Sequence, residues 1–135
     1  MPKGKCRCGK SHFEVFGEAK FQLLCCCHDC QKMTGAGHAA IMIFSAENSV
    51  IAGELGQFTY EADNGNKVTH HFCASCGTPL FNKNSKYQNA IYVMVGALEN
   101  PDIFTPERVI YTDSATKWDV YPSDIPSFGK MPIRK

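Results

Sequence analysis

The sequence predicts a mainly β protein with at most one short helix, and three features of the chain indicate this class. Apolar residues occur in short runs separated by Gly, Asn and Asp, which is typical of strands joined by turns. An Asn-Gly pair at 64–65 lies between two alternating segments and is a strong signal of a β-hairpin. No long amphipathic pattern is present. The 135 residues suit one domain, which we expect to span residues 1–135.

The expected strands follow one another along most of the chain. They span residues 12–17, 20–25, 39–45, 49–53, 57–62, 67–72, 89–98 and 108–112. The first two are expected to pair around residues 17–19, and the run 89–98 fits a long central strand that is buried on both faces.

A single short helix is expected between the second and third strands. It starts near residues 28–29, where Asp29 can cap it, and ends at Gly35. The tail 121–135 contains three prolines and is expected to wrap the surface without regular structure.

The charge of the chain excludes several classes of partner. There are 14 Lys and Arg residues against 13 Asp and Glu, so no strong field exists to attract nucleic acid or an anionic membrane. The start of the chain has no apolar segment of a secretion signal, and no run approaches the length of a membrane span. We therefore expect a cytoplasmic protein that binds neither nucleic acid nor membrane. The sequence does not indicate the oligomeric state.

Eight cysteines fall into three clusters, and their spacing indicates metal binding. Disulfide frameworks belong mainly to secreted chains, and buried thiols without a role would show no regular spacing. Zinc prefers four tetrahedral ligands, and C-x-x-C and C-x-C segments present pairs of thiolates. The clusters are Cys6 and Cys8; Cys25, Cys26, Cys27 and Cys30; and Cys73 and Cys76.

Spacing alone leaves the grouping of these ligands open. The first cluster can join Cys73 and Cys76 in a closed four-sulfur site, which leaves C-x-C-x-x-C with an open fourth position. It can equally join Cys27 and Cys30, and Cys26 or His28 can also supply a ligand. On the extended backbone Cys26 points away from its neighbours, so we expect it to pack as a small apolar side chain.

A three-thiolate zinc site favours sulfur chemistry. Three thiolates give a divalent cation a net negative charge, so the centre is poorly suited to acidifying water and prefers a soft external thiol. Such a thiol, held as the thiolate, can attack a small carbonyl compound. Lys32 lies two residues after the last ligand and is a candidate to hold a carboxylate of the thiol. Trp118 and Phe128 are candidates for an apolar pocket mouth, with core packing as the alternative.

Several motifs, in order along the chain, resemble those of the glutathione-dependent formaldehyde-activating enzyme family, which shares its domain with centromere protein V. They are GKCRCG, CCCHDCQKMTGA, FCASCGTPLF, GALENP and W-x-x-x-x-x-DIPSF, and the resemblance runs from about residue 4 to residue 132. The family usually has His at the position of Cys26, Arg at that of Gln31, and a proline just before Trp118.

The resemblance implies a fold and two metal sites. The fold is a set of coiled antiparallel β-sheets pinned by zinc, sometimes called a β-tent. The structural zinc would be held by Cys6, Cys8, Cys73 and Cys76, and the catalytic zinc by Cys25, Cys27 and Cys30.

The resemblance also implies a reaction. The expected function is that of a zinc-dependent carbon–sulfur lyase or synthase that adds glutathione, or a related thiol, to formaldehyde or a similar small aldehyde, giving S-hydroxymethylglutathione. Lys32 and Trp118 would contact the thiol. Two alternatives are a non-catalytic zinc module that binds a protein partner and a glutathione carrier without catalysis.

Overall fold

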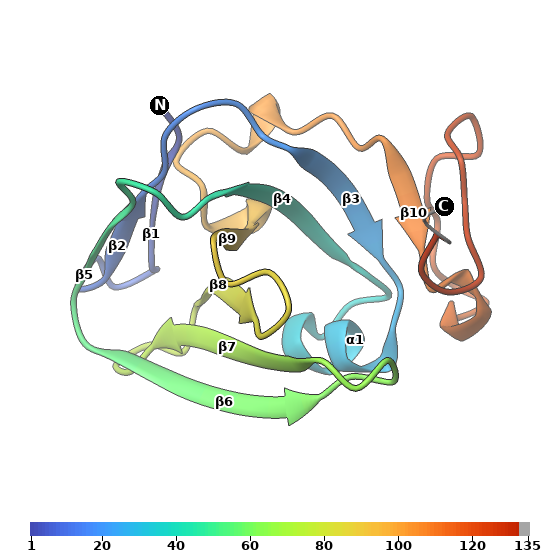
Figure 1. Ribbon diagram of the computed structural model, residues 1–135, viewed down its shortest axis with the longest axis horizontal. Coiled ribbons are helices and arrows are strands. Elements are labelled where there is room, and N and C mark those ends of the chain that lie inside the picture. The colour runs from blue at the N-terminus through green and yellow to red at the C-terminus, as the bar shows by residue number, and fades with distance from the viewer. Residues whose placement is uncertain (133–135) are drawn as a thin grey trace.

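A strongly curved seven-stranded sheet dominates the computed structural model, which describes residues 1–132 (Figure 1). Its strand order is β10-β3-β4-β9-β8-β7-β6. In this order the strands span Arg108–Ile110, Phe21–Cys25, Ala39–Ser45, Ala90–Met94, Pro79–Asn84, Lys67–Cys73 and Leu55–Glu61. All neighbours are antiparallel except β10 and β3, which run parallel.

One face of this sheet carries a row of paired side chains that crosses five strands. Phe21 on β3 pairs with Ile43, which pairs with Tyr92, and Tyr92 pairs with Asn82. Asn82 in turn pairs with His70 on β7. Directly opposite residues point to the same side of a sheet, so positions distant in sequence meet on one concave surface.

The other face of the large sheet packs against a small three-stranded sheet. Its order is β1-β2-β5, with strands at Lys3–Lys5, His12–Glu14 and Val50–Ala52. Between the sheets lies a core in which Phe13 meets Phe81 edge to face, with ring centroids 6.4 Å apart. His71 also stacks on Phe81, at 4.5 Å, so His70 and His71 occupy opposite faces of β7. Successive side chains of a strand point to opposite faces, so the adjacent positions of these two histidines predict this arrangement.

The helix α1, His28–Thr34, follows β3 and lies near the end of the curled sheet (Figure 1). Its N-cap is Cys27, not Asp29 as predicted, because the Cys27 sulfur accepts a hydrogen bond from the backbone N–H of Cys30. Asp29 lies in the first turn instead. Gly35 ends the helix in the left-handed conformation, at φ 71°, as predicted.

The mainly β class is confirmed, but two predicted elements are wrong in detail. Residues 12–17 and 20–25 do not form a hairpin, because Phe13 and Val15 are buried between the sheets and β3 belongs to the other sheet. The run 89–98 is a strand only to Met94 and continues as a 3₁₀ turn, Val95–Ala97. Further 3₁₀ turns lie at Pro101–Ile103 and Thr112–Ser114.

The tail follows β10 and crosses its outer side without a long strand. An isolated bridge joins Val109 and Ser127, and the backbone N–H of Phe128 donates to Val109. The last three residues of the predicted tail lie outside the described residues. Within residues 1–132, no helix has the length and apolar character needed to cross a membrane.

Candidate active site

Three cysteines come together where β3 turns into α1. Cys25 ends the strand, Cys27 caps the helix, and Cys30 lies in its first turn. Their sulfur atoms all lie within 4.8 Å of one another. In a tetrahedral zinc site with Zn–S distances of about 2.3 Å, the sulfurs are about 3.8 Å apart, so this group can hold one metal ion. A strand end followed at once by a helix start therefore converts the C-x-C-x-x-C spacing into a three-sulfur cluster.

The three thiols differ in how readily each loses its proton. Hydrogen bonds from the Cys25 and Cys30 thiols, together with backbone N–H groups, lower the pKa of Cys27 to about 3. The contact with Cys27 raises the pKa of Cys25, and contacts with Cys25 and Cys27 raise that of Cys30. Of the three thiols, Cys27 therefore loses its proton most readily, and its thiolate disfavours ionisation of Cys25 and Cys30. A divalent cation favours the loss of the other two protons.

A second group of four cysteines joins two turns that are far apart in the sequence. The sulfur of Cys8 lies 3.5 Å from that of Cys6 and 3.7 Å from that of Cys73, and Cys76 completes the group. These separations fit a tetrahedral metal site. The structure thus groups Cys6 and Cys8 with Cys73 and Cys76, and the alternative grouping with Cys27 and Cys30 is excluded.

The three-cysteine cluster lies in the wall of a cavity of about 710 Å³ on the concave face of the large sheet. This volume is typical of a small-molecule site. All three cysteines line the cavity, whereas the four-cysteine group does not. The cavity wall is mostly apolar and aromatic, and the residues include Phe21, Leu23, Ile41, Ile43, Tyr60 and Tyr92.

Charged side chains lie around the same cavity. Lys83, Lys86 and Arg108 line it, as do the carboxylates of Asp29 and Asp63. Burial lowers the pKa of Lys83, and the guanidinium of Arg108 lies 4.9 Å from the ring centroid of Phe21. The cavity therefore combines an apolar body with groups of both signs, which suits a zwitterionic small molecule.

Among residues 1–132, one side-chain hydrogen bond connects the two ends of the curled sheet across this cavity. The hydroxyl of Tyr111 donates to Oδ1 of Asp63 at 2.7 Å, joining the end of β10 to the tip of the β6–β7 hairpin. Both residues line the cavity. Tyr111 has a left-handed backbone, φ 59°, which is uncommon for a residue other than glycine.

Comparison with known proteins decides the family. Residues 1–114 match the family described as glutathione-dependent formaldehyde-activating enzyme. The chain belongs to this family. None of the curated proteins matches it.

A solved crystal structure of a Rhodobacter sphaeroides protein is similar to this member of the formaldehyde-activating family. The TM-score is 0.57 at 18% sequence identity, and the likeness covers 93% of this chain and 98% of that one. At this identity the comparison shows a shared fold alone.

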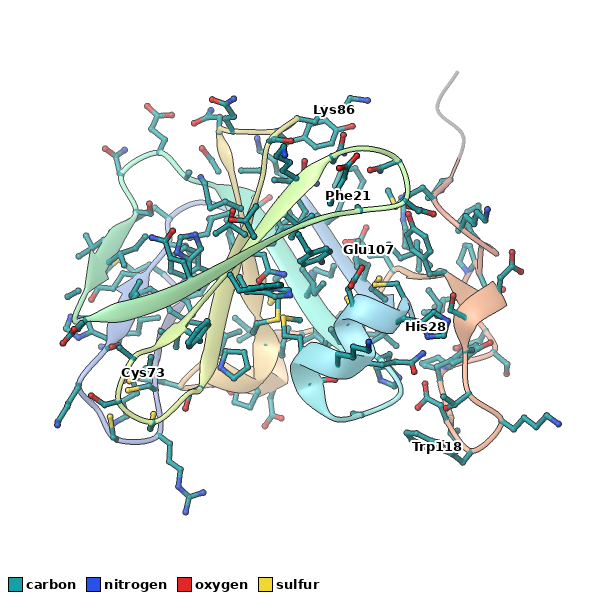
Figure 2. All side chains as sticks on the ribbon, turned by 90° about the horizontal axis from the view of Figure 1, so that it is seen from below. Phe21, His28, Cys73, Lys86, Glu107 and Trp118 are labelled. Atoms are coloured by element: carbon teal, nitrogen blue, oxygen red, sulfur yellow. The ribbon has the colours of Figure 1, made fainter. Side chains whose placement is uncertain are left out.

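The structure separates the remaining predicted site residues of this formaldehyde-activating family member from its cavity. Lys32 is exposed near the end of α1 and does not line the cavity. Trp118 is 69% exposed and lies at the edge of the molecule, on the opposite side of the view from Cys73 (Figure 2). Cys26 is fully buried, and burial raises its pKa to about 11, as expected for a packed thiol. Neither Cys26 nor His28 joins a cysteine group.

Gln31 has a role that the sequence did not indicate. Its side-chain amide donates to the backbone oxygen of Cys26 at 2.8 Å and to that of Ser114 at 2.9 Å. It therefore ties the cysteine segment to the 3₁₀ turn Thr112–Ser114 that follows β10.

Most of the cavity wall is also not predictable from local patterns in the sequence. Tyr60, Asn82, Tyr92 and Arg108 come from four different strands, and only the sheet register brings them together. The sequence carried no signal for Asn82, because it stands beside Lys83 and Asn84 in the segment PLFNKN.

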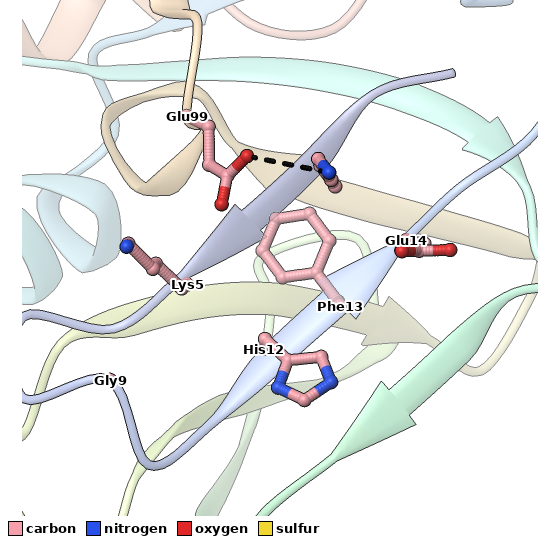
Figure 3. A pocket seen from close by; sticks show the side chains of 7 residues that line it. Lys5, Gly9, His12, Phe13, Glu14 and Glu99 are labelled. Atoms are coloured by element: carbon pink, nitrogen blue, oxygen red, sulfur yellow. Dashed lines mark ion pairs between the residues drawn. The ribbon is translucent and has the colours of Figure 1, made fainter.

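A smaller cavity, of about 250 Å³, lies beside β1 and β2 (Figure 3). Lys3 and Glu99 form an ion pair at 3.9 Å there, with both side chains well exposed. It contains none of the cysteines, so we place the chemistry in the large cavity.

Proposed function

We propose that this protein adds glutathione, or a closely related thiol, to formaldehyde or a similar small aldehyde. The product is a hemithioacetal, which for glutathione and formaldehyde is S-hydroxymethylglutathione. The observation that carries the proposal is the three-cysteine cluster in the wall of a ligand-sized cavity. Membership of the formaldehyde-activating family supports the choice of thiol and aldehyde. The activity would be that of a carbon–sulfur lyase acting in the direction of addition.

We assign zinc to both cysteine groups on the chemistry of their donors. Sets of four and of three thiolates suit a soft or borderline divalent cation and not magnesium or calcium. Cys6, Cys8, Cys73 and Cys76 form a closed structural set, whereas Cys25, Cys27 and Cys30 leave one position for a ligand. When bound at the three-cysteine set, zinc supplies the positive charge that stabilises an external thiolate at neutral pH.

The other residues of the cavity suit the parts of glutathione that do not react. Glutathione carries two carboxylates and one ammonium group. Lys83, Lys86 and Arg108 can hold the carboxylates, and Asp29 can hold the ammonium group. We prefer these cations to Lys32 because they line the cavity. A role for Lys32 and Trp118 in thiol binding stays a prediction, and so does the cytoplasmic location.

The direct test follows exchange between glutathione and ¹³C-labelled formaldehyde by NMR, with zinc content measured by mass spectrometry. The wild-type protein is expected to accelerate exchange, and the Cys27→Ser variant is expected to lose both the acceleration and the thiol binding. Glutathione binding without faster exchange would identify a carrier. If the protein holds zinc and neither binds glutathione nor accelerates exchange, the proposed function is wrong.

A further inference from the structure

Asn82 is a buried polar side chain in an otherwise apolar surface. Only 7% of it is exposed, and Ser11 is the one other polar residue classed as buried in the part of the chain that the structure describes. On the concave face of the sheet it lies between His70 and Tyr92 in the strand register. It also lines the cavity that contains the three cysteines. A buried amide at such a position needs a partner.

The two ends of the Asn82 amide are satisfied to different degrees. Its oxygen, Oδ1, lies 2.8 Å from Nδ1 of His70, and because Oδ1 can only accept, His70 donates. Its nitrogen, Nδ2, has one partner within residues 1–132, the thioether sulfur of Met33 at 3.8 Å. Thioether sulfur is a weak acceptor, and Nδ2 carries two hydrogens, so most of its donor capacity is unused.

The position of Nδ2 relates this donor to the reacting group. Met33 lies on α1 one turn after Cys30, and it packs against the apolar cluster that contains Cys25 and Cys30. Residues three apart on a helix are neighbours on its surface. Asn82 therefore lines the same cavity as the three cysteines and, through Met33, contacts the apolar cluster that contains Cys25 and Cys30.

We propose that Nδ2 of Asn82 donates a hydrogen bond to the carbonyl oxygen of the aldehyde while negative charge develops on it. The inference rests on the proposed thiol addition. In that step the thiolate sulfur forms a bond to the carbonyl carbon, and the π-electron pair of the C=O bond moves to oxygen. The oxygen then takes a proton from water, replacing the proton that the thiol released to water. A fixed donor in an apolar site stabilises such an oxyanion strongly.

His70 is a positioning residue in this arrangement. Its Nδ1–H fixes Oδ1 of Asn82, so the amide cannot rotate its oxygen towards the cavity. The ring of Tyr60 packs on the imidazole at 4.9 Å between centroids and holds it in place. A donor that is already oriented needs no reorganisation when the charge develops.

The test compares catalysis with thiol binding in Asn82→Leu and in Asn82→Asp, which keeps the shape of the side chain. Protein-catalysed glutathione–formaldehyde exchange is expected to fall about 100-fold in both, a typical loss for one oxyanion donor. In Asn82→Leu, which adds no charge, the affinity for glutathione alone and the zinc content should stay at wild-type values. The matched control is Asn89→Asp, which makes the same change at an exposed residue outside the cavity.

His70 is tested by splitting the kinetic constants. His70→Phe keeps a ring beside Tyr60 and removes the donor, so kcat should fall while KM for glutathione stays constant. His70→Gln restores an N–H donor and should recover part of kcat. Equal losses in the two variants would overturn the positioning role.

A second measurement does not depend on activity. The ¹⁵N and ¹H shifts of the Asn82 side-chain amide should move when formaldehyde is added to wild-type protein saturated with glutathione. Unmoved shifts, or wild-type exchange rates in both Asn82 variants, would overturn the role of Asn82 and leave the proposed function standing. If the wild-type protein itself fails to accelerate exchange, the proposed function fails and this inference fails with it.

Discussion

The two cysteine groups differ in how they combine sequence distance with exposure. The four-cysteine group joins Cys8 to Cys73, 65 residues apart, and two of its members, Cys8 and Cys76, are exposed. The three-cysteine group lies within six consecutive residues, and Cys25 and Cys30 are buried. A metal in the first group cross-links distant turns at the surface. A metal in the second closes a short local turn, but it does so in the wall of a cavity.

Ligand number and chain topology together therefore indicate which cysteine group is structural and which is catalytic. A closed set of four thiolates leaves no place for a substrate, and it restrains the chain most when its ligands are far apart. A local set of three restrains little chain and leaves one position open. We therefore expect stability to depend on the first group and chemistry on the second.

The largest effect is expected from Cys73→Ser. Structural zinc contributes on the order of 10 kcal/mol of apparent binding free energy, which is similar to the roughly 5–15 kcal/mol net stability of a typical domain. The variant should be insoluble or should lack a cooperative thermal transition. Ser75→Ala, a change at an exposed residue of the same turn, is the control and should melt like the wild type. A folded Cys73→Ser protein with a normal melting temperature would contradict the structural role.

Cys30→Ser should affect chemistry and leave the fold intact. The three-cysteine group cross-links only a local turn, so the melting temperature should change by a few degrees at most, about 1 kcal/mol in stability. Zinc content should fall by one ion per chain, and glutathione binding should be lost. Calorimetry, thermal unfolding and metal analysis check these outcomes. If Cys30→Ser collapses while Cys73→Ser stays folded, the two assignments are reversed.

A smaller effect should distinguish the groups immediately after a chelator removes the metal, before the chain without its structural zinc unfolds. Hydrogen bonds from the Thr78 hydroxyl and from backbone N–H groups lower the pKa of Cys76 to about 5, and that of Cys27 is about 3. At pH 6 both are thiolates because the pH is above their lowered pKa values, while an ordinary cysteine stays protonated.

Iodoacetamide at pH 6 should therefore label Cys76 first, because it is exposed, and Cys27 next. Cys25, Cys26 and Cys30 should react last, since they are buried. Peptide mapping by mass spectrometry gives the order. Labelling of Cys26 before Cys27 would show that the electrostatics of the three-cysteine cluster is not as described.

The smallest effect is expected from Trp118→Ala. The side chain is 69% exposed and does not line the large cavity, so the glutathione affinity should stay within about twofold of wild type, a change of about 0.4 kcal/mol. Calorimetric titration measures it. A loss of tenfold or more, about 1.4 kcal/mol, would restore the thiol-binding role predicted from the sequence.

Local patterns in the sequence predict local structure well in this protein. The strand 39–45, the hairpin around residues 64–65 and the end of α1 at Gly35 all agree with the structure, because each depends on neighbouring residues. The three cysteines of one strand–helix turn are predicted for the same reason. The division of the eight cysteines into four, three and a buried one needed the family resemblance, since spacing left it open.

Contacts between segments that are distant in the sequence could not be predicted from local sequence patterns. The parallel pairing of β10 with β3 and the separation of β2 from β3 depend on which apolar faces the two sheets cover. The cavity wall depends on register across the large sheet, where Asn82 meets His70 only because β7 and β8 pair as they do. Lys32 is close to the cysteines in sequence, but its helical position turns it towards solvent.

The hydrogen bond between Tyr111 and Asp63 gives the curled sheet a seam. β6 and β10 are the two edge strands of that sheet, and in the part of the chain that the structure describes no backbone ladder joins them. Opening the seam therefore costs about 1 kcal/mol for one exposed hydrogen bond, whereas parting two paired strands costs a whole series of bonds. Paired strands thus form most of the cavity wall, and one side-chain hydrogen bond closes the wall between β10 and the β6–β7 hairpin. Separating β10 from the β6–β7 hairpin at this point leaves every ladder of the large sheet within residues 1–132 intact.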